Sequence, residues 1–167
     1  MKIKCLTNID DYKKGNIYEV EENKRIMQQY IDGFLNNRDY SEANEILHKD
    51  YSGSAGGGIT GVDGIKQYIS YMSTIVSDGH WETLEMLAEG DKVSVFQKYT
   101  GTFDGEFQGI YGQDQPLSFL IAGVYEFRDG KVYRGLSTAV TEWLDCYQQM
   151  GVLPPTEEII QTYKESL

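Results

Sequence analysis

The sequence predicts an α+β protein in which a curved antiparallel sheet wraps over N-terminal helices. In the first half of the chain, apolar residues recur at the three- and four-residue spacing of amphipathic helices. In the second half, runs rich in aromatic and β-branched residues are separated by short turn signals, which is typical of strands. Helices followed by a run of antiparallel strands is the order of an α+β domain. A curved sheet over a long helix makes a cone with a pocket at its mouth.

The first half of the chain is expected to form three helices. The first runs from residue 21 to Asn36 and Asn37, and a second, shorter one covers residues 41–47. The third follows the Gly-rich stretch at residues 52–64. Its buried stripe consists of Ile65, Tyr68, Ile69, Met72, Ile75 and Val76. The Gly-rich stretch has no P-loop ending and no strand–Gly–helix unit around it, so we interpret it as a flexible rim.

The second half is expected to supply strands over residues 80–88 and 92–103 and a hairpin that turns at Asp129 and Gly130. Asp-Gly between two apolar runs favours a tight turn, because Gly adopts a positive φ angle without steric cost. A short helix over residues 142–150 follows the hairpin. These elements account for the chain up to the Pro-Pro dipeptide that precedes its last residues.

The two strands of the hairpin can pair in either of two registers. A two-residue loop would place Arg128 opposite Lys131, which brings like charges together. A three-residue loop with a bulge would instead pair Glu126 with Arg134, and we favour it for that reason. The favoured register would also stack Phe127 on Tyr133. It gathers the following residues on one face of the sheet: Gly123, Tyr125, Phe127, Tyr133, Gly135 and Ser137.

Length and composition predict one domain with two short additions. A chain of 167 residues is long enough to bury a sizeable core. We divide it into an N-terminal arm over residues 1–20, the domain itself over residues 21–154, and a C-terminal helix over residues 155–167. The N-terminal arm has no clear hydrophobic period.

Net charge, the length of apolar runs and cysteine spacing argue against several kinds of partner and cofactor. The formal net charge of -11 argues against a nucleic-acid partner, because the phosphate backbone would be repelled. No apolar run approaches the roughly 20 residues of a membrane span, so no membrane partner is expected. Cys5 and Cys146 fit no metal-ligand spacing and are interpreted as reduced thiols. We therefore expect a cytoplasmic protein without a metal or cofactor, and the N-terminus lacks the features of a signal peptide.

Short motifs between Asn23 and Pro154 carry a family resemblance. They are LHKDYSG at 47–53, Gly61 with Gly64 before a helix, AEGDKV at 88–93, GTFDGEFQGI at 101–110, EFRDGKV at 126–132 and QQMGVLP at 148–154. In this order and spacing the chain resembles the SnoaL-like polyketide cyclases, within the nuclear-transport-factor-2-like superfamily. The resemblance implies a cone-shaped, cystatin-like α+β barrel with a ligand pocket inside. It also implies a homodimer formed through the outer face of the sheet.

The resemblance further implies a catalytic pair, which this sequence lacks. In the family's cyclases an acidic residue on the strand after the Asp-Gly-Lys turn removes a proton, helped by a polar or His side chain on the preceding strand. The acid's position is Ser137 when counted from the turn, or Ala139 when counted back from QQMG, and the helper falls near Gly123. A serine without a base is a poor proton acceptor near neutral pH. The family's activity is therefore not carried over.

Two other residues are candidate proton carriers. Glu142 is the nearest downstream carboxylate and would serve as a base if it lay buried at the cone mouth. It equally suits the first turn of the 142–150 helix, where the helix dipole favours an acid. His80 opens a strand and would act as acid or base if it pointed into the pocket, but a His at this place also suits a purely structural role at the rim.

A mixed aromatic and polar set is expected to line the pocket. The set is Tyr30, Phe34, Tyr68, Trp81, Gln97, Tyr99, Tyr125 and Ser137. Aromatic residues at these spacings also suit an ordinary core. The expected ligand is a small hydrophobic or aromatic, polyketide-like molecule. The protein would either act on it as a cofactor-free cyclase or isomerase with divergent catalytic residues, or hold it as a non-catalytic binding or dimeric scaffold protein.

Overall fold

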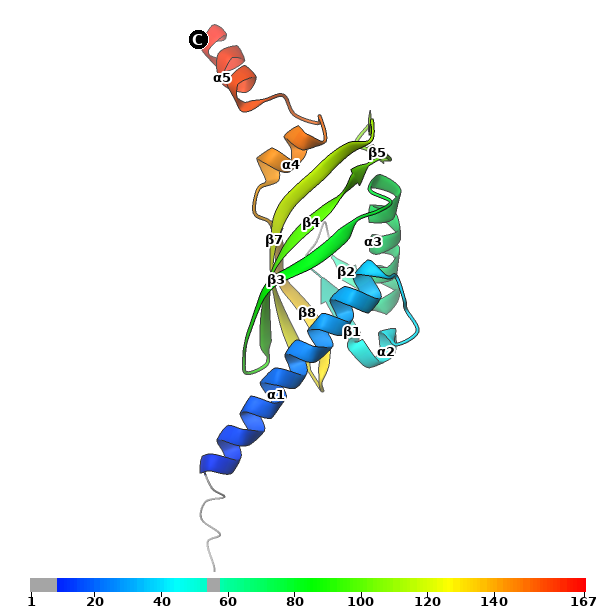
Figure 1. Cartoon of the computed structure of the whole chain (residues 1–167), viewed down its shortest axis with the longest axis vertical. Helices are drawn as coiled ribbons and strands as arrows, with labels where there is room; N and C mark the ends of the chain where they lie inside the picture. Colours follow the sequence, from blue (N-terminus) through cyan, green and yellow to red (C-terminus); the bar gives the residue numbers. More distant parts are fainter. Residues whose placement is uncertain (1–8, 54–57) are drawn as a thin grey trace, which may run out of the picture.

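The computed structural model has a curved, open sheet with helices against its concave face (Figure 1). It describes the backbone of residues 9–53 and 58–167, and the side chains of these residues except 9–16 and 137–140. The sheet has six strands in the order β2-β1-β8-β7-β4-β3. The predicted α+β class is confirmed. The predicted curved sheet over helices is confirmed as well, and the sheet is open, with β2 and β3 as its two edge strands.

The helices and strands follow one another along the described chain in this way. The helices are α1 (Ile9–Gln29), η1 (Tyr30–Asn36), α2 (Ala43–Ile46), α3 (Gly61–Ile75), α4 (Trp143–Gln149) and α5 (Thr156–Glu165). The strands are β1 (Leu47–Gly53), β2 (Ile59–Thr60), β3 (His80–Glu89), β4 (Lys92–Phe103), β5 (Glu106–Phe107), β6 (Ile110–Tyr111), β7 (Gln115–Arg128) and β8 (Lys131–Val140). The expected end of the first helix and the expected position of the third are confirmed.

The first helix differs from the prediction in where it begins and in the geometry of its last part. It begins at Ile9, so the expected boundary of the N-terminal arm near residue 20 falls inside one continuous helix. Its last part, η1, is a π-helix, in which the backbone N–H of Asn37 reaches back to the carbonyl of Asp32 at 3.1 Å. A π-helix adds a residue to the turn and so changes the direction in which side chains point. Here Tyr30 and Leu35 both turn inward and are buried.

The sheet is antiparallel except at one edge. β3, β4, β7 and β8 pair antiparallel, as predicted, but β1 runs parallel to β8. The sequence analysis placed residues 47–53 at a helix end and in the Gly-rich rim, which is wrong. These residues show no clean period-two alternation, so their strand depends on the neighbouring β8 rather than on local pattern. The expected rim is partly the short strand β2, and residues 54–57 lie outside the described part of the chain.

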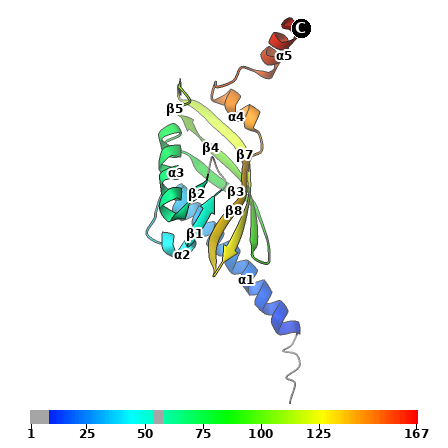
Figure 2. The ribbon, with the colours of Figure 1, turned by 180° about the vertical axis from the view of Figure 1, so that it is seen from behind.

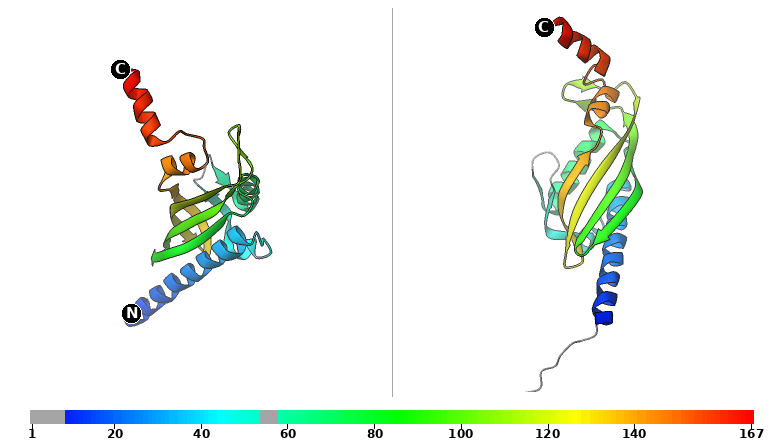
Figure 3. Two further views of the ribbon diagram at one scale, coloured as in Figure 1. Left: turned by 45° about the horizontal axis from the view of Figure 1, so that its top comes forward. Right: turned by 90° about the vertical axis from the view of Figure 1, so that its left-hand side faces the viewer.

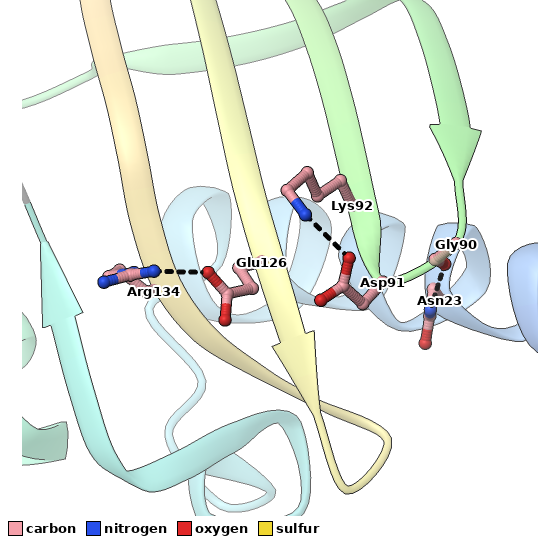
Figure 4. Close-up of polar contacts among 6 residues, drawn as sticks. All are labelled: Asn23, Gly90, Asp91, Lys92, Glu126 and Arg134. Carbon is pink, nitrogen blue, oxygen red and sulfur yellow. Dashed lines mark hydrogen bonds and ion pairs between the residues drawn. The ribbon is translucent and has the colours of Figure 1, made fainter.

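The β7–β8 hairpin combines the two registers considered above. Arg128 pairs with Lys131 across a two-residue turn in which Asp129 and Gly130 both have positive φ angles, so the favoured three-residue loop is wrong. A bulge at Tyr133 then restores the predicted pairing of Glu126 with Arg134 (Figure 4). Val132, not Tyr133, is therefore the inward-facing residue.

Separate partners for the two cations make the two-residue turn possible. The guanidinium carbon of Arg128 lies 3.5 Å from the centre of the Tyr133 ring, whereas Lys131 donates to the carbonyl of Asn44 at 2.6 Å. Because the two charges point to different neighbours, the like-charge pair costs less than the sequence pattern suggests. The bulge at Tyr133 supplies the ring that Arg128 covers.

The structure is elongated, with the hairpin turns at one end and α4 with β5 at the other (Figures 1 and 2). α1 crosses the sheet and is tied to the β3–β4 turn by Asn23, whose amide donates to the Gly90 carbonyl at 3.4 Å (Figure 4). α5 stands away from the body and buries none of its residues (Figure 3). No helix in the described part of the chain is long and apolar enough to cross a membrane.

The β5–β6 hairpin gives a testable prediction about stability. A Cβ atom at Gly105 would overlap the backbone carbonyl of Thr74, because the Gly105 N–H donates to the Ile75 carbonyl at 3.0 Å and holds the two segments together. Gly105→Ala is expected to lower the free energy of unfolding by about 2 kcal/mol or more, as measured by urea denaturation. Gly33→Ala is the control, since a Cβ there meets no atom within 4 Å. It should be neutral or stabilising by about 0.5 kcal/mol. Equal destabilisation by both would contradict this packing argument.

Candidate ligand-binding cavity

A cavity of about 550 Å³ lies between the concave face of the sheet and the helices η1, α3 and α4. Aromatic and aliphatic side chains form most of its lining. A volume of this size is in the range of small-molecule sites. The lining combines side chains of the curved sheet with side chains of these helices, so the cavity is enclosed between the two layers.

Most of the predicted lining residues meet in this cavity. Those that line it are Tyr30, Tyr68, Trp81, Gln97, Tyr99 and Tyr125. Phe34 does not, because it is fully buried behind Tyr30, with their ring centres 5.3 Å apart, and packs on Tyr40 at 4.7 Å. It is a core residue rather than part of the cavity wall. The side chain of Ser137 lies outside the described side chains.

An aromatic row crosses three strands at the centre of the cavity wall. Trp81 of β3, Tyr99 of β4 and Phe119 of β7 are direct cross-strand neighbours. Their ring centres are 4.8 Å apart for Trp81 and Tyr99, and 5.0 Å apart for Tyr99 and Phe119. Alternate residues of a strand face the same side, so Gln97 of β4 and Leu117 and Ile121 of β7 add to this wall. The row offers a flat apolar surface to whatever enters the cavity.

Buried tyrosines gather at a second part of the lining. Tyr30 and Tyr51 share a hydrogen bond between their hydroxyl groups, and burial raises the pKa of both phenols. Burial also raises the pKa of Tyr68. Tyr125 meets Tyr30 edge to face with ring centres 6.3 Å apart. The phenols of Tyr30, Tyr51 and Tyr68 are therefore uncharged at neutral pH and offer hydrogen bonds rather than charge.

Gln97 is the buried polar side chain whose hydrogen bonding is incomplete. It is only 2% exposed, and its Nε2 atom has no hydrogen-bond partner. Its neighbour across the β3–β4 ladder is Thr83, whose Oγ1 atom also lacks a partner. A buried donor without an acceptor costs roughly 1–3 kcal/mol. Since Gln97 lines the cavity, a molecule inside it is in a position to satisfy this donor.

Further lining residues were missed by the sequence analysis. They include Tyr51 on β1, Phe107 on β5, Trp143, Cys146 and Tyr147 on α4, and Met150 directly after α4. The α4 residues recur at three- and four-residue spacing, which was a usable signal for an inward-facing helix side. Tyr51 carried no such signal because β1 itself was not predicted.

A model of one protein family matches most of the chain. It is the SnoaL-like polyketide cyclase, matched over residues 24–152. The chain belongs to the SnoaL-like polyketide cyclase family. No curated protein matches it.

Solved structures of related fold agree with the SnoaL-like assignment. TsrD from Streptomyces laurentii has 20% sequence identity and a TM-score of 0.70, covering 80% of this chain and 97% of its own. A candidate SnoaL-like polyketide cyclase from Jannaschia sp. CCS1 has 15% identity and a TM-score of 0.71, covering 81% and 95%. An M. tuberculosis LEH-like epoxide hydrolase has 16% identity and a TM-score of 0.60, covering 79% and 86%. The fold is that of the nuclear-transport-factor-2-like superfamily.

The expected proton carriers of this SnoaL-like chain lie away from the cavity lining. Glu142 is exposed and stands at the N-terminus of α4, and His80 is exposed at the start of β3. Neither lines the cavity, and the described lining holds no carboxylate or imidazole. A role for either residue as proton carrier remains a prediction that this placement does not favour.

The helper position that the SnoaL-like resemblance places near Gly123 is covered by the chain's own Tyr125. A Cβ atom at Gly123 would lie 2.8 Å from the Tyr125 ring. Because residues two apart on a strand share a face, the absence of a side chain at Gly123 lets the Tyr125 ring lie along β7. Ser137 and Ala139, the two possible positions of the acid, pair with Val124 and Ala122 on β7.

No metal-binding site is found in the part of the chain that the structure describes. No group of three or more His, Cys, Asp or Glu residues there is arranged to hold a metal ion. The expected absence of any cofactor remains a prediction. Cys146 is the remaining ionisable group of the described lining besides the tyrosines. Burial raises the pKa of its thiol to about 11.

The raised pKa of Cys146 predicts low thiol reactivity at neutral pH. The reactive form is the thiolate, which makes up roughly one part in ten thousand at pH 7 for a pKa near 11. In a Cys5→Ser variant, which leaves Cys146 as the sole cysteine, the rate of reaction with iodoacetamide should rise about tenfold per pH unit up to pH 10. The urea-unfolded variant is the control and should level off near the ordinary thiol pKa. A folded protein whose rate levels off at that same pH would rule out the burial effect.

Proposed function

We propose that the protein binds a small, uncharged, flat apolar or aromatic molecule of polyketide-like size in the cavity. The observation that carries this proposal is a lining of aromatic and aliphatic side chains that contains a buried amide nitrogen without a hydrogen-bond partner. An aromatic row favours flat ligands by stacking. An uncharged ligand is favoured because the described lining has no charged group to pair with a charge. Membership of the SnoaL-like polyketide cyclase family supports the same class of ligand.

Gln97 narrows the chemistry of this ligand. Its unpartnered Nε2 atom is a donor, so the ligand would carry an acceptor such as a carbonyl oxygen at this place. Satisfying a buried donor adds affinity that an apolar analogue of the same shape cannot supply. The neutral phenols of Tyr30 and Tyr51 add further hydroxyl groups to the lining.

Binding without proton abstraction is the form of the function that the lining favours. General-base catalysis needs a group whose pKa lies near the working pH. The described lining holds tyrosines and a cysteine with raised pKa values instead. The protein would then hold or carry its ligand rather than transform it.

A second candidate is a cofactor-free cyclase or isomerase, which the family match favours. In that case the donors of Gln97 and the tyrosines would stabilise negative charge on a carbonyl oxygen of the substrate, and solvent would accept the proton. Steady turnover of a polyketide-like substrate that is reduced at least tenfold in Gln97→Leu would favour this candidate over binding alone.

We also propose that the protein is a homodimer joined through the outer face of the sheet. Large apolar side chains are exposed on this face, namely Leu84, Leu87, Phe96 and Leu136. None of the described helices covers it (Figure 3). An exposed apolar patch on a soluble domain commonly marks an interface.

Intrinsic fluorescence tests binding directly. Both tryptophans of the chain, Trp81 and Trp143, line the cavity. Titration with 9-fluorenone, a flat tricyclic ketone, is expected to quench their emission with saturation. Trp143→Phe leaves Trp81 as a reporter of the cavity wall and should retain the quenching. No saturable quenching by fluorenone or by its hydrocarbon analogue fluorene would count against the proposed function.

Gln97→Leu tests the polar contact. The variant is expected to weaken fluorenone binding about tenfold and to leave fluorene binding unchanged, because only the ketone loses a hydrogen bond. Removing an unpartnered buried donor should also leave the free energy of unfolding of the ligand-free protein unchanged or higher. Gln113→Leu, at an exposed position, is the matched control. If Gln97→Leu weakens the binding of fluorenone and of fluorene equally, Gln97 contributes only to the shape of the cavity and donates no hydrogen bond to the ligand.

Leu87→Glu tests the proposed dimer. Light scattering after size exclusion should give twice the chain mass of 19.0 kDa for the unmodified protein and a single chain mass for the variant. A carboxylate in a buried apolar interface is costly, which is the reason for the expected dissociation. Ile17→Glu is the control, since Ile17 is 64% exposed on α1 and Leu87 is 63% exposed on β3. If Ile17→Glu dissociates the dimer and Leu87→Glu does not, the interface lies on α1 instead of the sheet.

A further inference from the structure

The exposed members of the lining show where the cavity opens. Trp143 on α4 and Tyr71 on α3 line the cavity and yet are 51% and 53% exposed, whereas Tyr30 at the other side of the lining is 2% exposed. The opening therefore lies between α3 and α4. Phe107 of β5 also lines the cavity and places the β5–β6 hairpin beside this opening.

Apolar side chains continue from the opening onto the outer surface. Phe107 stacks on Tyr147 with ring centres 6.1 Å apart, and Tyr147 meets Trp143 at 5.3 Å, so aromatic contacts link β5 to α4. On β6, next to β5, Ile110 is 38% exposed and Tyr111 is 75% exposed. We define the mouth surface as Tyr71, Ile110, Tyr111 and Trp143.

Charge at this end of the molecule is predominantly negative, although Arg38 reaches toward it and donates to the carbonyl of Ser77 at 2.9 Å. Residues 99–127 and 135–163, which include β5, β6 and α4, contain no Lys or Arg. They do contain these carboxylates near the mouth surface: Asp104, Glu106, Asp114, Glu142 and Asp145. Lys66 of α3 lies 5.5 Å from the centre of the Tyr40 ring and so points toward the η1–α2 connection instead.

The cations gather at the other end of the sheet. Lys92, Arg128, Lys131 and Arg134 lie around the β3–β4 and β7–β8 turns, which are at the opposite end of the long axis from α4 and β5 (Figures 1 and 2). An exposed apolar surface with a clear excess of one sign of charge around it selects partners by charge as well as by shape. At the mouth surface the matching charge is positive.

We propose that the mouth surface docks a basic amphipathic segment of another protein. Apolar side chains of the segment would cover Tyr111 and Trp143, and its Lys or Arg residues would face the surrounding carboxylates. An acidic partner or an anionic membrane surface would be repelled by the same carboxylates. Because the mouth surface surrounds the opening of the cavity, a segment bound there would also control access to it.

A labelled peptide tests the proposal. The probe is a 14-residue helix-forming peptide of Lys and Leu at amphipathic spacing, and its counterpart carries Glu in place of Lys. Fluorescence anisotropy at about 0.15 M salt is expected to give saturable binding of the Lys peptide at least tenfold tighter than of the Glu peptide. Equal binding of the two peptides, or no binding of the Lys peptide, overturns the proposal.

Matched variants locate the binding surface. Glu142→Lys and Tyr111→Ala are each expected to raise the Kd of the Lys peptide about fivefold. Glu19→Lys and Tyr18→Ala on α1 make the same chemical changes far from the mouth, and Tyr18 is 76% exposed where Tyr111 is 75% exposed. These controls should change the Kd less than twofold. Equal effects from variants and controls would reduce the binding to general attraction between opposite charges and overturn the proposal.

Two other occupants are distinguished in the same set of experiments. If a second copy of the chain covers the mouth surface, Tyr111→Ala will lower the mass of the protein alone in sedimentation, and the proposal fails. If a lipid surface covers it, the unmodified protein will float with vesicles of neutral phosphatidylcholine whereas Tyr111→Ala will not, and the proposal fails as well. Peptide binding does not require an occupied cavity, so this result is independent of the fluorenone titration.

Discussion

The long antiparallel pairing of β4 with β7 is the constraint on which the rest of the structure depends. Its register runs without interruption from Lys92 opposite Glu126 to Phe103 opposite Gln115. Because side chains alternate between the two faces, this one register decides which residues line the cavity and which face the outside. A shift by one residue would turn Gln97 and Tyr99 outward and bring Phe96 and Lys98 into the cavity. The cavity and the exposed outer face are therefore two results of the same pairing.

The unpartnered polar groups at the cavity lower the stability of the empty protein and favour ligand binding. A well-packed core has no buried donor without an acceptor, yet Gln97 has one, with the unpartnered hydroxyl of Thr83 beside it on the ladder. Such groups lower the stability of the empty protein and raise the gain from a ligand that satisfies them. The tyrosines differ, since Tyr30 and Tyr51 bond to each other and are satisfied without a ligand. Gln97 is thus the lining residue with the clearest reason to be polar.

Much of the fold and part of the site could be predicted from the sequence. The α3 stripe and the strands at residues 80–103 were correct because their hydrophobic periods are long and regular. Tyr30, Gln97 and Tyr125 line the cavity because they lie at inward positions of such elements. Phe34 shares the helical period of Tyr30 but lies in the core, since the period specifies the buried side of a helix and does not distinguish a wall from what lies behind it.

The sequence by itself determined the class of fold, the family, and the lack of an acid at the family's position, because these depend on periodicity, motif spacing and residue identity. Only the tertiary structure decided that residues 47–53 form a strand parallel to β8, that the hairpin has a two-residue turn, and that Glu142 and His80 stand outside the cavity lining. The physical reason is common to all of them. Each depends on a neighbour distant in sequence, such as β8 for β1 or the carbonyl of Asn44 for Lys131, and local pattern carries no information about such neighbours.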